Sequence, residues 1–182
     1  MNVIDTKLQG VRIIEPALHV DHRGFFLEIY NTKIYRTYNI EYQFVQDNHS
    51  LSKEQGVIRG LHYQVSPHSQ AKLIYVLAGS IYDVVVDIRR NSQTFGHWIG
   101  VHLSAENKRQ LLVPHGFAHG FCTTEPNTEV LYKVDKLYSP EHDRGILWND
   151  PALGIDWPTD QPILSDKDTK HPLLRDADIN FE

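Results

Sequence analysis

The stretch "KLIYVLAGSIYDVVVDIRR", residues 72–90, decides the fold class. It holds two runs rich in β-branched and aromatic residues on either side of Ala78-Gly79-Ser80. Runs of this composition around a glycine-containing turn are typical of β-strands. We therefore expect a β-hairpin here.

The segments on both sides of this stretch repeat the pattern of short strands and turns. Residues 10–31 read as two strands separated by the turn "DHRG", and residues 43–50 as a strand with a polar end. Residues 96–124 hold two further strands around the turn "SAENKR", followed by an irregular approach to a third. Residues 128–140 form another expected strand, and one short helix is expected over residues 31–40.

Strands without long helices between them exclude a parallel α/β sheet and leave an antiparallel sandwich or barrel. The jelly roll is the commonest closed form. From residue 141 onward Pro, Asp and Gly become frequent, which predicts a tail of loops packed on the body by Ile146, Leu147, Trp148, Ile155 and Trp157. We expect one all-β domain over 1–182, with short peripheral helices. Its parts are an N-terminal arm (about 1–45), a barrel core (about 46–140) and a loop-rich C-terminal segment (about 141–182).

Composition narrows the class of function. The chain has 182 residues, of which 41% are hydrophobic, enough for a real core. A formal net charge of -5 argues against a nucleic acid or an anionic membrane as partner. No apolar block marks a signal peptide or a membrane span, and Cys122 is the only cysteine. We expect a cytoplasmic enzyme or binding protein.

Strand parity indicates which polar side chains face the interior, because every second side chain of a barrel strand points inward. Lys72 shares parity with the apolar Ile74 and Val76, and Asp83 shares parity with Ile81. An inward lysine is costly unless a carboxylate or an anionic ligand meets it. A site at the barrel mouth would combine a base, a cation, a carboxylate and a phenol from His62, Lys72, Asp83, His119 and Tyr132.

Each of these residues also has an ordinary structural explanation. A single strand histidine is more often a satisfied core or surface residue, and a lysine at a strand start usually extends to water. A strand tyrosine usually packs. Asp83 can pair with an arginine, and His119 can cap a turn. The prediction of a site therefore depends on the joint arrangement.

One motif is similar to a known superfamily. The segment "LLVPHGFAHGF" resembles the second motif of the cupin superfamily, with its matching positions at Pro114, Gly116 and His119. The first cupin motif would place metal ligands at His62, Gln64 and Lys72. Metal cations take neutral imidazoles and carboxylates, and a fixed ammonium repels them. The resemblance implies a cupin-type jelly-roll barrel without a metal, in which Lys72 supplies the positive charge.

The whole chain resembles the dTDP-4-dehydrorhamnose 3,5-epimerase family. The matching segments span about residues 20–170 and are "DHRGFFLEIYN", "FVQDNHS", "VIRGLHYQ", "QAKLIYVLAGSIYDVVVDIRRNSQTFG", "LSAENKRQLLVPHGFAHGF", "EVLYKVDKLYSP", "ILWNDPALGIDWP" and "LSDKD". The resemblance implies an isomerase of dTDP-L-rhamnose biosynthesis. Such an enzyme inverts C3 and C5 of dTDP-4-dehydro-6-deoxy-D-glucose by acid/base proton transfer, without metal or cofactor, to give dTDP-4-dehydro-L-rhamnose. Sister enzymes share these motifs, so a single-carbon (C3 or C5) epimerase is the alternative.

The resemblance also implies roles for the catalytic residues. His62 resembles the general base, whose ordinary pKa near neutrality suits proton abstraction. Tyr132 resembles the acid on the opposite face, and Lys72 would stabilise the oxyanion. For the carboxylate behind His62 the resemblance favours Asp168 and strand parity makes Asp83 the alternative; the sequence leaves both open.

Substrate contacts follow from the same resemblance. Arg23, Arg59, His119 and Lys167 resemble anion-contacting residues, and Glu28, Gln46, Asn48 and Asp143 resemble polar contacts to base and sugars. Tyr138 matches the residue that stacks on thymine. The ordinary alternatives are an Arg23–Glu28 ion pair and a core position for Tyr138. The family further implies a homodimer whose N-terminal strand pairs with the partner and whose pocket draws residues from both chains.

Two other classes of function compete with this interpretation. Gln64 and Lys72 disfavour a metal-dependent cupin such as a dioxygenase. A sugar-nucleotide binding module without activity needs no acid–base pair, so the set of His62, Lys72 and Tyr132 disfavours it.

Overall fold

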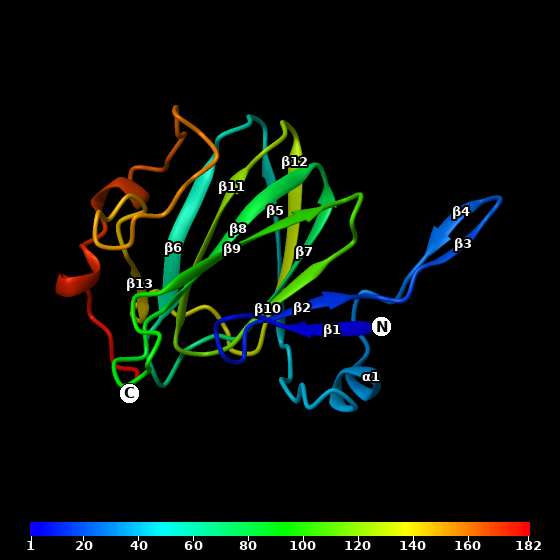
Figure 1. Ribbon diagram of the computed structural model, residues 1–182, viewed down its shortest axis with the longest axis horizontal. Coiled ribbons are helices and arrows are strands. Elements are labelled where there is room, and N and C mark those ends of the chain that lie inside the picture. The colour runs from blue at the N-terminus through cyan, green and yellow to red at the C-terminus, as the bar shows by residue number, and fades with distance from the viewer.

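Two antiparallel sheets face each other in the computed structural model, which describes residues 1–182 (Figure 1). The six-stranded sheet has the order β1 (Asn2–Asp5), β2 (Arg12–Glu15), β10 (Gln110–Val113), β7 (Lys72–Ala78), β12 (Thr128–Val134), β5 (Gln46–Ser52). The five-stranded sheet has the order β13 (Asp143–Gly145), β6 (Ile58–Gln64), β11 (Phe117–Thr123), β8 (Ser80–Asp87), β9 (Trp98–Ser104).

Few elements lie outside the barrel. β3 (His19–Asp21) and β4 (Gly24–Phe26) form a hairpin that projects from the body, as expected around "DHRG" (Figure 1). The helices are α1 (Thr32–Arg36) and the one-turn 3₁₀ helices η1 (Asp168–Lys170) and η2 (Leu174–Asp176). None of them has the length and hydrophobicity that crossing a membrane requires. The predicted all-β jelly roll with short peripheral helices and a loop-rich tail is confirmed.

The space between the two sheets is filled by the inward side chains that strand alternation predicts. Ile74 and Val76 of β7 and Val130 of β12 meet Ile81 and Val85 of β8 in one buried cluster. Burial of aliphatic side chains of this size stabilises a fold by about 1.5–3 kcal/mol each. This cluster fills one part of the interior, and the polar residues of β6, β7, β8 and β12 lie beside it.

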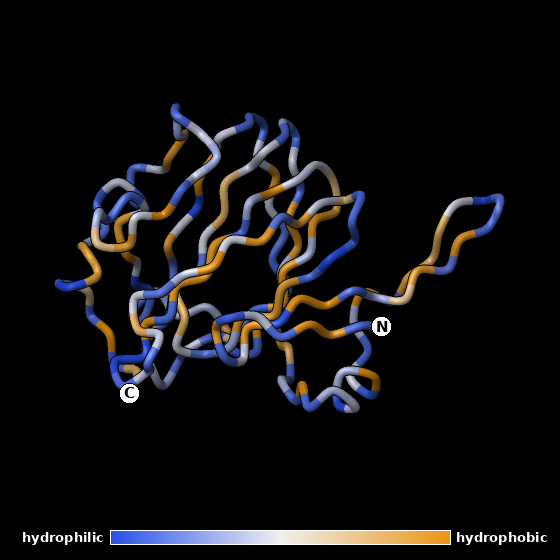
Figure 2. The backbone as a smooth tube through the Cα atoms, in the orientation of Figure 1, coloured by the Kyte–Doolittle hydropathy of each residue, from blue (hydrophilic) through white to orange (hydrophobic).

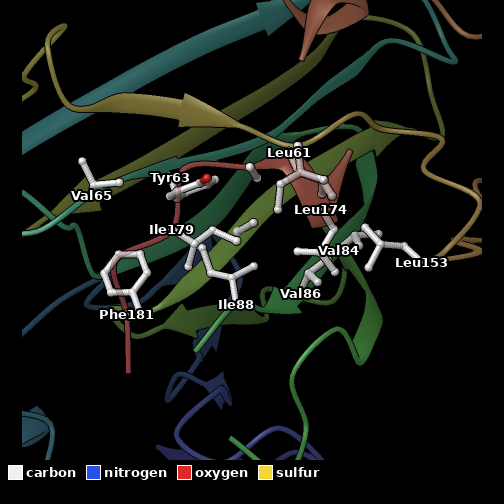
Figure 3. Packing of buried hydrophobic residues seen from close by; sticks show 13 residues of the cluster. Leu61, Tyr63, Val65, Val84, Val86, Ile88, Leu153, Leu174, Ile179 and Phe181 are labelled. Atoms are coloured by element: carbon white, nitrogen blue, oxygen red, sulfur yellow. The ribbon is translucent and has the colours of Figure 1, made fainter. Parts of the chain in front are cut away.

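The C-terminal segment covers the outer face of the five-stranded sheet (Figures 1 and 3). Val84 and Val86, which alternate with the inward residues of β8, pack against Leu174, Ile179 and Phe181 of the tail. Three of the five residues predicted to pack this segment do so: Ile146 is fully buried in the cluster, and Ile155 and Trp157 pack against it. Leu147 and Trp148 are half-buried outside the cluster. The tail is therefore one layer of the fold, although it contains little regular structure.

The short helix α1 lies on the outer face of the six-stranded sheet at one end. The side chain of Asn31 caps it by accepting hydrogen bonds from the backbone N–H groups of Lys33 and Ile34. Tyr35 is buried against Leu73 and Leu112, which face outward from β7 and β10. The helix expected over 31–40 exists, and it ends earlier, at Arg36.

The predicted hairpin over residues 72–90 is wrong. β7 and β8 are separated only by Gly79, and they belong to different sheets, so the chain crosses from one sheet to the other. Gly79 has a φ of 71°, and a Cβ there would lie 2.3 Å from Thr128 Oγ1. A glycine turn between two β-rich runs suits a hairpin and a corner between sheets equally well, and the apolar inner faces of both runs favour the corner.

The strand expected over residues 128–140 ends earlier than predicted. A strand continuing to residue 140 would place Lys136 and Tyr138 on one face with Tyr132. β12 stops at Val134, so both residues lie in the following loop. Asp135, which accepts a hydrogen bond from the backbone N–H of Ala71, marks the point where the chain leaves the sheet.

Candidate active site

His62 and Asp168 are in close polar contact at the barrel mouth. β6 carries His62, and η1 in the tail brings the buried Asp168 to it, with 2.5 Å between Nε2 and Oδ1. Ser165 donates a hydrogen bond to the other carboxylate oxygen at 2.9 Å. Burial alone would raise the pKa of Asp168, but the hydrogen bond and the charge of His62 lower it below its ordinary value. Asp168, and not Asp83, therefore contacts His62.

Asp83 has a different partner. Its carboxylate is fully buried and lies 2.9 and 3.0 Å from Nε2 of His119, which β11 carries on the neighbouring strand. Burial raises the pKa of Asp83, and the nearby His119 and Lys72 partly offset the rise. Asp83 is thus paired with neither an arginine nor His62, and His119 does not cap a turn.

Lys72 is a buried cation with no protein partner. It stands at the start of β7 on the inward face and makes no hydrogen bond or ion pair. Burial lowers the pKa of its ammonium to about 8, and the more distant Asp143 and Asp83 offset part of that effect. A buried ammonium that lacks a counter-ion is costly, so this position suits an anion that arrives with a ligand.

Tyr132 completes the group from the six-stranded sheet. It faces inward from β12, where it is paired in register with Ile74 of β7. Burial raises the pKa of its phenol, and the positive charge of Arg59 offsets part of the rise. Tyr132 therefore keeps its proton at neutral pH, as a proton donor requires.

These side chains line one cavity of about 420 Å³. Its wall is formed by Ser50, Val57, Ile58, Arg59, His62, Lys72, His119, Phe121, Tyr132, Ile163, Leu164, Ser165, Lys167 and Asp168. The wall thus combines two histidines, a buried carboxylate, a phenol and three cationic residues with apolar surface. Asp83 does not line the cavity and lies behind His119.

A second hollow of about 330 Å³ shares His62, Lys72, Tyr132 and Lys167 with the first. Its other predicted residues hold one another: Gln46 accepts a hydrogen bond from the backbone N–H of Tyr138 at 3.0 Å and donates to Asn48 at 2.9 Å. Asp143 accepts hydrogen bonds from the Tyr138 hydroxyl and from Lys167. Tyr138 is 54% exposed, which excludes the alternative of a core aromatic.

Two predicted residues lie outside the cavity of their own chain. Arg23 stands in the turn of the projecting hairpin, where it pairs with Asp21 and its side chain is 79% exposed. Glu28 is exposed at the base of the arm and accepts a hydrogen bond from Asn31 at 3.2 Å. Arg23 and Glu28 do not form the ion pair that was the ordinary alternative. Arg59 does line the cavity and donates to Ser52 Oγ at 3.3 Å.

Sequence reasoning missed two residues around this site, Ser165 and His171, and the structural role of a third, Gln64, which it named only at a cupin ligand position. Ser165 holds Asp168, and His171 has its Nε2 at 3.5 Å from Asp168 Oδ1. Gln64 donates to the carbonyl of His68 at 2.6 Å and accepts from the backbone N–H of Ser139 at 2.8 Å, so it fixes the loop that carries Tyr138. The available signal was spacing: residues three apart, such as Asp168 and His171, share one side of a 3₁₀ turn.

The chemistry of this group is proton transfer next to a carbonyl. The arrangement offers a histidine backed by a carboxylate, a phenol that keeps its proton, and a buried ammonium without a counter-ion. An ammonium in such a position stabilises negative charge that develops on an oxygen. The group therefore suits abstraction of a proton α to a carbonyl and its return from another residue.

The family model and the relatives that this chain resembles carry the same family description. Residues 5–176 match the family model described as dTDP-4-dehydrorhamnose 3,5-epimerase. The chain is 51% identical over 179 residues to the dTDP-4-dehydrorhamnose 3,5-epimerase of Shigella flexneri, covering 98% of each chain.

Solved structures show the same similarity. The dTDP-4-dehydrorhamnose 3,5-epimerase of Bacillus anthracis, with TDP and pyrophosphate bound, superposes with a TM-score of 0.93 at 56% identity and covers 94% of this chain and 98% of that one. The dTDP-6-deoxy-D-glucose-3,5-epimerase of Legionella pneumophila, in complex with dTDP-4-keto-L-rhamnose, gives 0.93 at 49% identity, covering 97% and 94%.

Proposed function

Because the chain belongs to the dTDP-4-dehydrorhamnose 3,5-epimerase family of cupin-type isomerases, we propose that it converts dTDP-4-dehydro-6-deoxy-D-glucose to dTDP-4-dehydro-L-rhamnose in dTDP-L-rhamnose biosynthesis. Inversion at both C3 and C5 is supported by relatives of about half identity that carry the 3,5-epimerase name. The observation that carries the proposal is the His62–Asp168 pair in one cavity with Lys72 and Tyr132.

His62 is the proposed general base. The hydrogens on C3 and C5 are both α to the C4 ketone, so removal of either one gives an enolate. The lowered pKa of Asp168 keeps its carboxylate ionised, so the hydrogen between the pair belongs to His62 Nε2. That leaves Nδ1 of His62 to accept the substrate proton, while Asp168 stabilises the imidazolium that forms.

Lys72 and Tyr132 are the proposed partners of the base. Lys72 has no counter-ion in the protein, so the enolate oxygen at C4 becomes its anion. This interaction is strongest in the transition state, where it lowers the barrier. Tyr132, whose raised pKa keeps it protonated, returns a proton from the face opposite His62 and so inverts the carbon.

The nucleotide is the proposed occupant of the rest of the cavity. Arg59 and Lys167 supply positive charge for the diphosphate, and the exposed ring of Tyr138 offers a flat surface for thymine. Gln46, Asn48 and Asp143 present polar groups to the base and sugars. His119 has its Nε2 occupied by Asp83, which leaves its Nδ1 for a ligand.

We further propose a homodimer in the cytoplasm. Arg23 and Glu28 lie outside the cavity of their own chain, and a partner chain would complete its pocket with them if the projecting arm crosses the interface. Val20, Phe25 and Phe26 on this arm are 71%, 57% and 66% exposed, and apolar surface of this kind marks interaction sites. The buried thiol of Cys122, the only cysteine, fits a reducing compartment.

Proton exchange in heavy water tests the proposed function. The purified chain is incubated with dTDP-4-dehydro-6-deoxyglucose in deuterium oxide, and NMR follows the hydrogens on C3 and C5 and the product. We expect deuterium at both carbons and the L-rhamno product, with His62→Ala inactive as control. Exchange at one carbon alone would establish the single-carbon alternative. Loss of activity with EDTA and recovery with a divalent ion would establish a metal-dependent cupin, and tight binding without exchange a binding module.

A further inference from the structure

His171 is a buried histidine that the proposed reaction does not use. Its side chain is nine-tenths buried, and its Nε2 is the one side-chain nitrogen or oxygen of the chain that is fully shielded from solvent and has no hydrogen-bond partner. A buried polar atom without a partner is costly and calls for an explanation. This atom lies 3.5 Å from Asp168 Oδ1, and the ring meets that of His62 edge to face at 5.5 Å between centroids.

The backbone fixes His171 in this position. Asp168 and His171 are three residues apart across η1, so their side chains leave the 3₁₀ turn on the same side. β13 pairs with β6 so that Gly145 stands opposite His62, and a Cβ on Gly145 would lie 2.4 Å from the His171 ring. The ring therefore occupies the space that a glycine leaves open beside the His62 strand.

Three potential metal ligands converge here. One ligand atom from each of His62, Asp168 and His171 lies within 4.8 Å of the others. Tetrahedral zinc with bonds of about 2.0–2.1 Å separates its ligand atoms by about 3.3 Å. The 3.5 Å between His171 Nε2 and Asp168 Oδ1 is close to that value, and the 2.5 Å between His62 and Asp168 must widen once a metal replaces the hydrogen between them.

The donor set selects a class of metal. Two imidazoles and one carboxylate suit borderline transition-metal cations such as Zn²⁺, Co²⁺ or Ni²⁺. Mg²⁺ and Ca²⁺ prefer sets of oxygen ligands and are poor candidates. Three protein ligands also leave a fourth position open to water or to a ligand. Lys167, which precedes Asp168 in sequence, is engaged by Asp143.

We propose that His62, Asp168 and His171 form an inhibitory site for Zn²⁺ and related divalent transition-metal cations. The site differs from the cupin metal position, because it uses two residues of the C-terminal tail. A metal on Nε2 of His62 leaves the ring hydrogen on Nδ1, which is the nitrogen that must accept the substrate proton. Inhibition, unlike binding, rests on the proposed function.

Calorimetric titration of the metal-free chain with Zn²⁺ tests the site without reference to activity. We expect binding at one site that His171→Ala and His171→Gln both weaken by at least about 10-fold, the low end of what loss of even an outer partner of a metal site costs. His102→Ala, which removes an exposed histidine of β9, is the matched control and should bind as the parent does. Mg²⁺ should give no binding.

Two further measurements complete the test. Co²⁺ bound to the parent chain should give the intense visible absorption of a four- or five-coordinate site. This measurement uses the unmodified protein, so it does not depend on whether a variant folds. Zn²⁺ should abolish epimerisation, EDTA should restore it, and His171→Gln should move inhibition to at least about 10-fold higher Zn²⁺. Equal Zn²⁺ affinity in parent and His171 variants, an octahedral Co²⁺ spectrum, or full activity with Zn²⁺ bound would each overturn the proposal. If the metal-free chain shows no epimerase activity but binds Zn²⁺ through His171, the proposed function is overturned and the metal site stands.

Discussion

Lys72 is a buried charged residue that has no hydrogen-bond or ion-pair partner in the protein. Its ammonium is buried without a counter-ion, and burial lowers its pKa to about 8 from an ordinary value of 10.5. The protein therefore bears the cost of a charge that it does not use until an anion arrives. A loss of folding stability of this kind is expected where a residue is placed to stabilise the transition state of a reaction.

The pH dependence of activity follows from this pKa. Lys72 loses its charge as pH rises through about 8, so stabilisation of the oxyanion is lost above that pH. We expect kcat/KM of the parent enzyme to fall on the alkaline side with an apparent pKa near 8. Lys72→Met should lower kcat by about 10²–10³-fold. A parent profile that stays flat to pH 10 would assign the cation to another residue.

The same pKa predicts an opposite effect on folding. The unfolded chain holds the Lys72 proton up to a higher pH than the folded chain, so this group makes folding less favourable below about pH 8 and the cost disappears as pH rises. We therefore expect Lys72→Met to be more stable than the parent at pH 7, by up to about 3 kcal/mol. Urea unfolding of both proteins at pH 7 and pH 9.5 measures the difference, which should shrink at the higher pH.

Tyr132 separates proton removal from inversion. Tyr132→Phe keeps the ring and loses only the hydroxyl, so His62 can still remove a proton and return it to the same face. Deuterium exchange from heavy water should continue while product formation falls much further. NMR compares the two rates in parent and variant, with His62→Ala as the control that loses both. An equal fall in both rates would mean that Tyr132 acts during proton removal.

Sequence reasoning located the inward residues but not all of their partners. Alternation along β7, β8 and β12 predicted that Lys72, Asp83 and Tyr132 face the interior, and all three do. Parity states which face of the sheet a side chain occupies. It does not state which residues of neighbouring strands lie at the same height in the barrel. For that reason Asp83 remained an alternative partner of His62, although it is bound to His119. Asp168 lies in the one-turn helix η1, which is too short to show periodicity in the sequence, so only the family resemblance pointed to it.

At the scale of elements, the C-terminal tail has two roles. It covers the outer face of the five-stranded sheet, and its η1 turn delivers Asp168 to His62. Ile163 reaches Val57 in an isolated bridge, which holds the tail beside the start of β6. The position of the Asp168 carboxylate therefore depends on how the tail packs on the sheet, because the tail has little regular secondary structure.

Gly145 tests that dependence. A Cβ at this position would overlap the His171 ring, so Gly145→Ala must push η1 and Asp168 away from His62. Overpacking of this kind costs about 1–3 kcal/mol. We expect Gly145→Ala to be less stable and to lose activity beyond its loss of stability. Adding His171→Ala removes the ring and should restore both. Thermal unfolding and kcat measure the pair, and a double variant as impaired as the single one would contradict the contact.

Elements were predictable from composition more readily than their connections. The strands around Gly79 were recognisable because β-branched residues fill both runs, but local composition does not state whether the strands pair with each other. Crossing from sheet to sheet is decided by contacts with β10, β11 and β12, which lie far away in sequence. The end of β12 at Val134 is likewise set by tertiary contacts.

At the scale of the whole molecule, the projecting arm is the feature that one chain does not explain. Its hairpin carries hydrophobic segments, orange in Figure 2, although it extends away from the body. Within the chain the ammonium of Lys108 lies 4.2 Å from the Phe25 ring centroid. The proposed homodimer would bury this exposed aromatic surface against a second copy of the chain.

Mixed dimers test whether the arm completes the partner's pocket. Arg23→Ala should lower kcat/KM by about 10- to 100-fold, the usual cost of losing a hydrogen bond to a charged group. When refolded together with His62→Ala, each mixed dimer regains one complete site, because the His62→Ala chain donates Arg23 to its partner. The activity of the mixture should exceed the sum of the activities that the Arg23→Ala and His62→Ala proteins show separately. A mixture of His62→Ala and Asp168→Asn has both lesions in the cavity wall and should show no gain.

The C-terminal segment follows the barrel strands in sequence, and this order has a consequence for synthesis. Translation delivers chains at about 5–20 residues per second, so the ribosome completes β6, β8 and β11 several seconds before the tail emerges. During that interval the growing barrel has no cover for Val84, Val86 and Ala118, which are fully buried in the finished fold. The nascent chain therefore exposes an apolar sheet face until Leu174, Ile179 and Phe181 emerge and cover it. Prematurely terminated products remain in that state and are targets for aggregation and proteolysis.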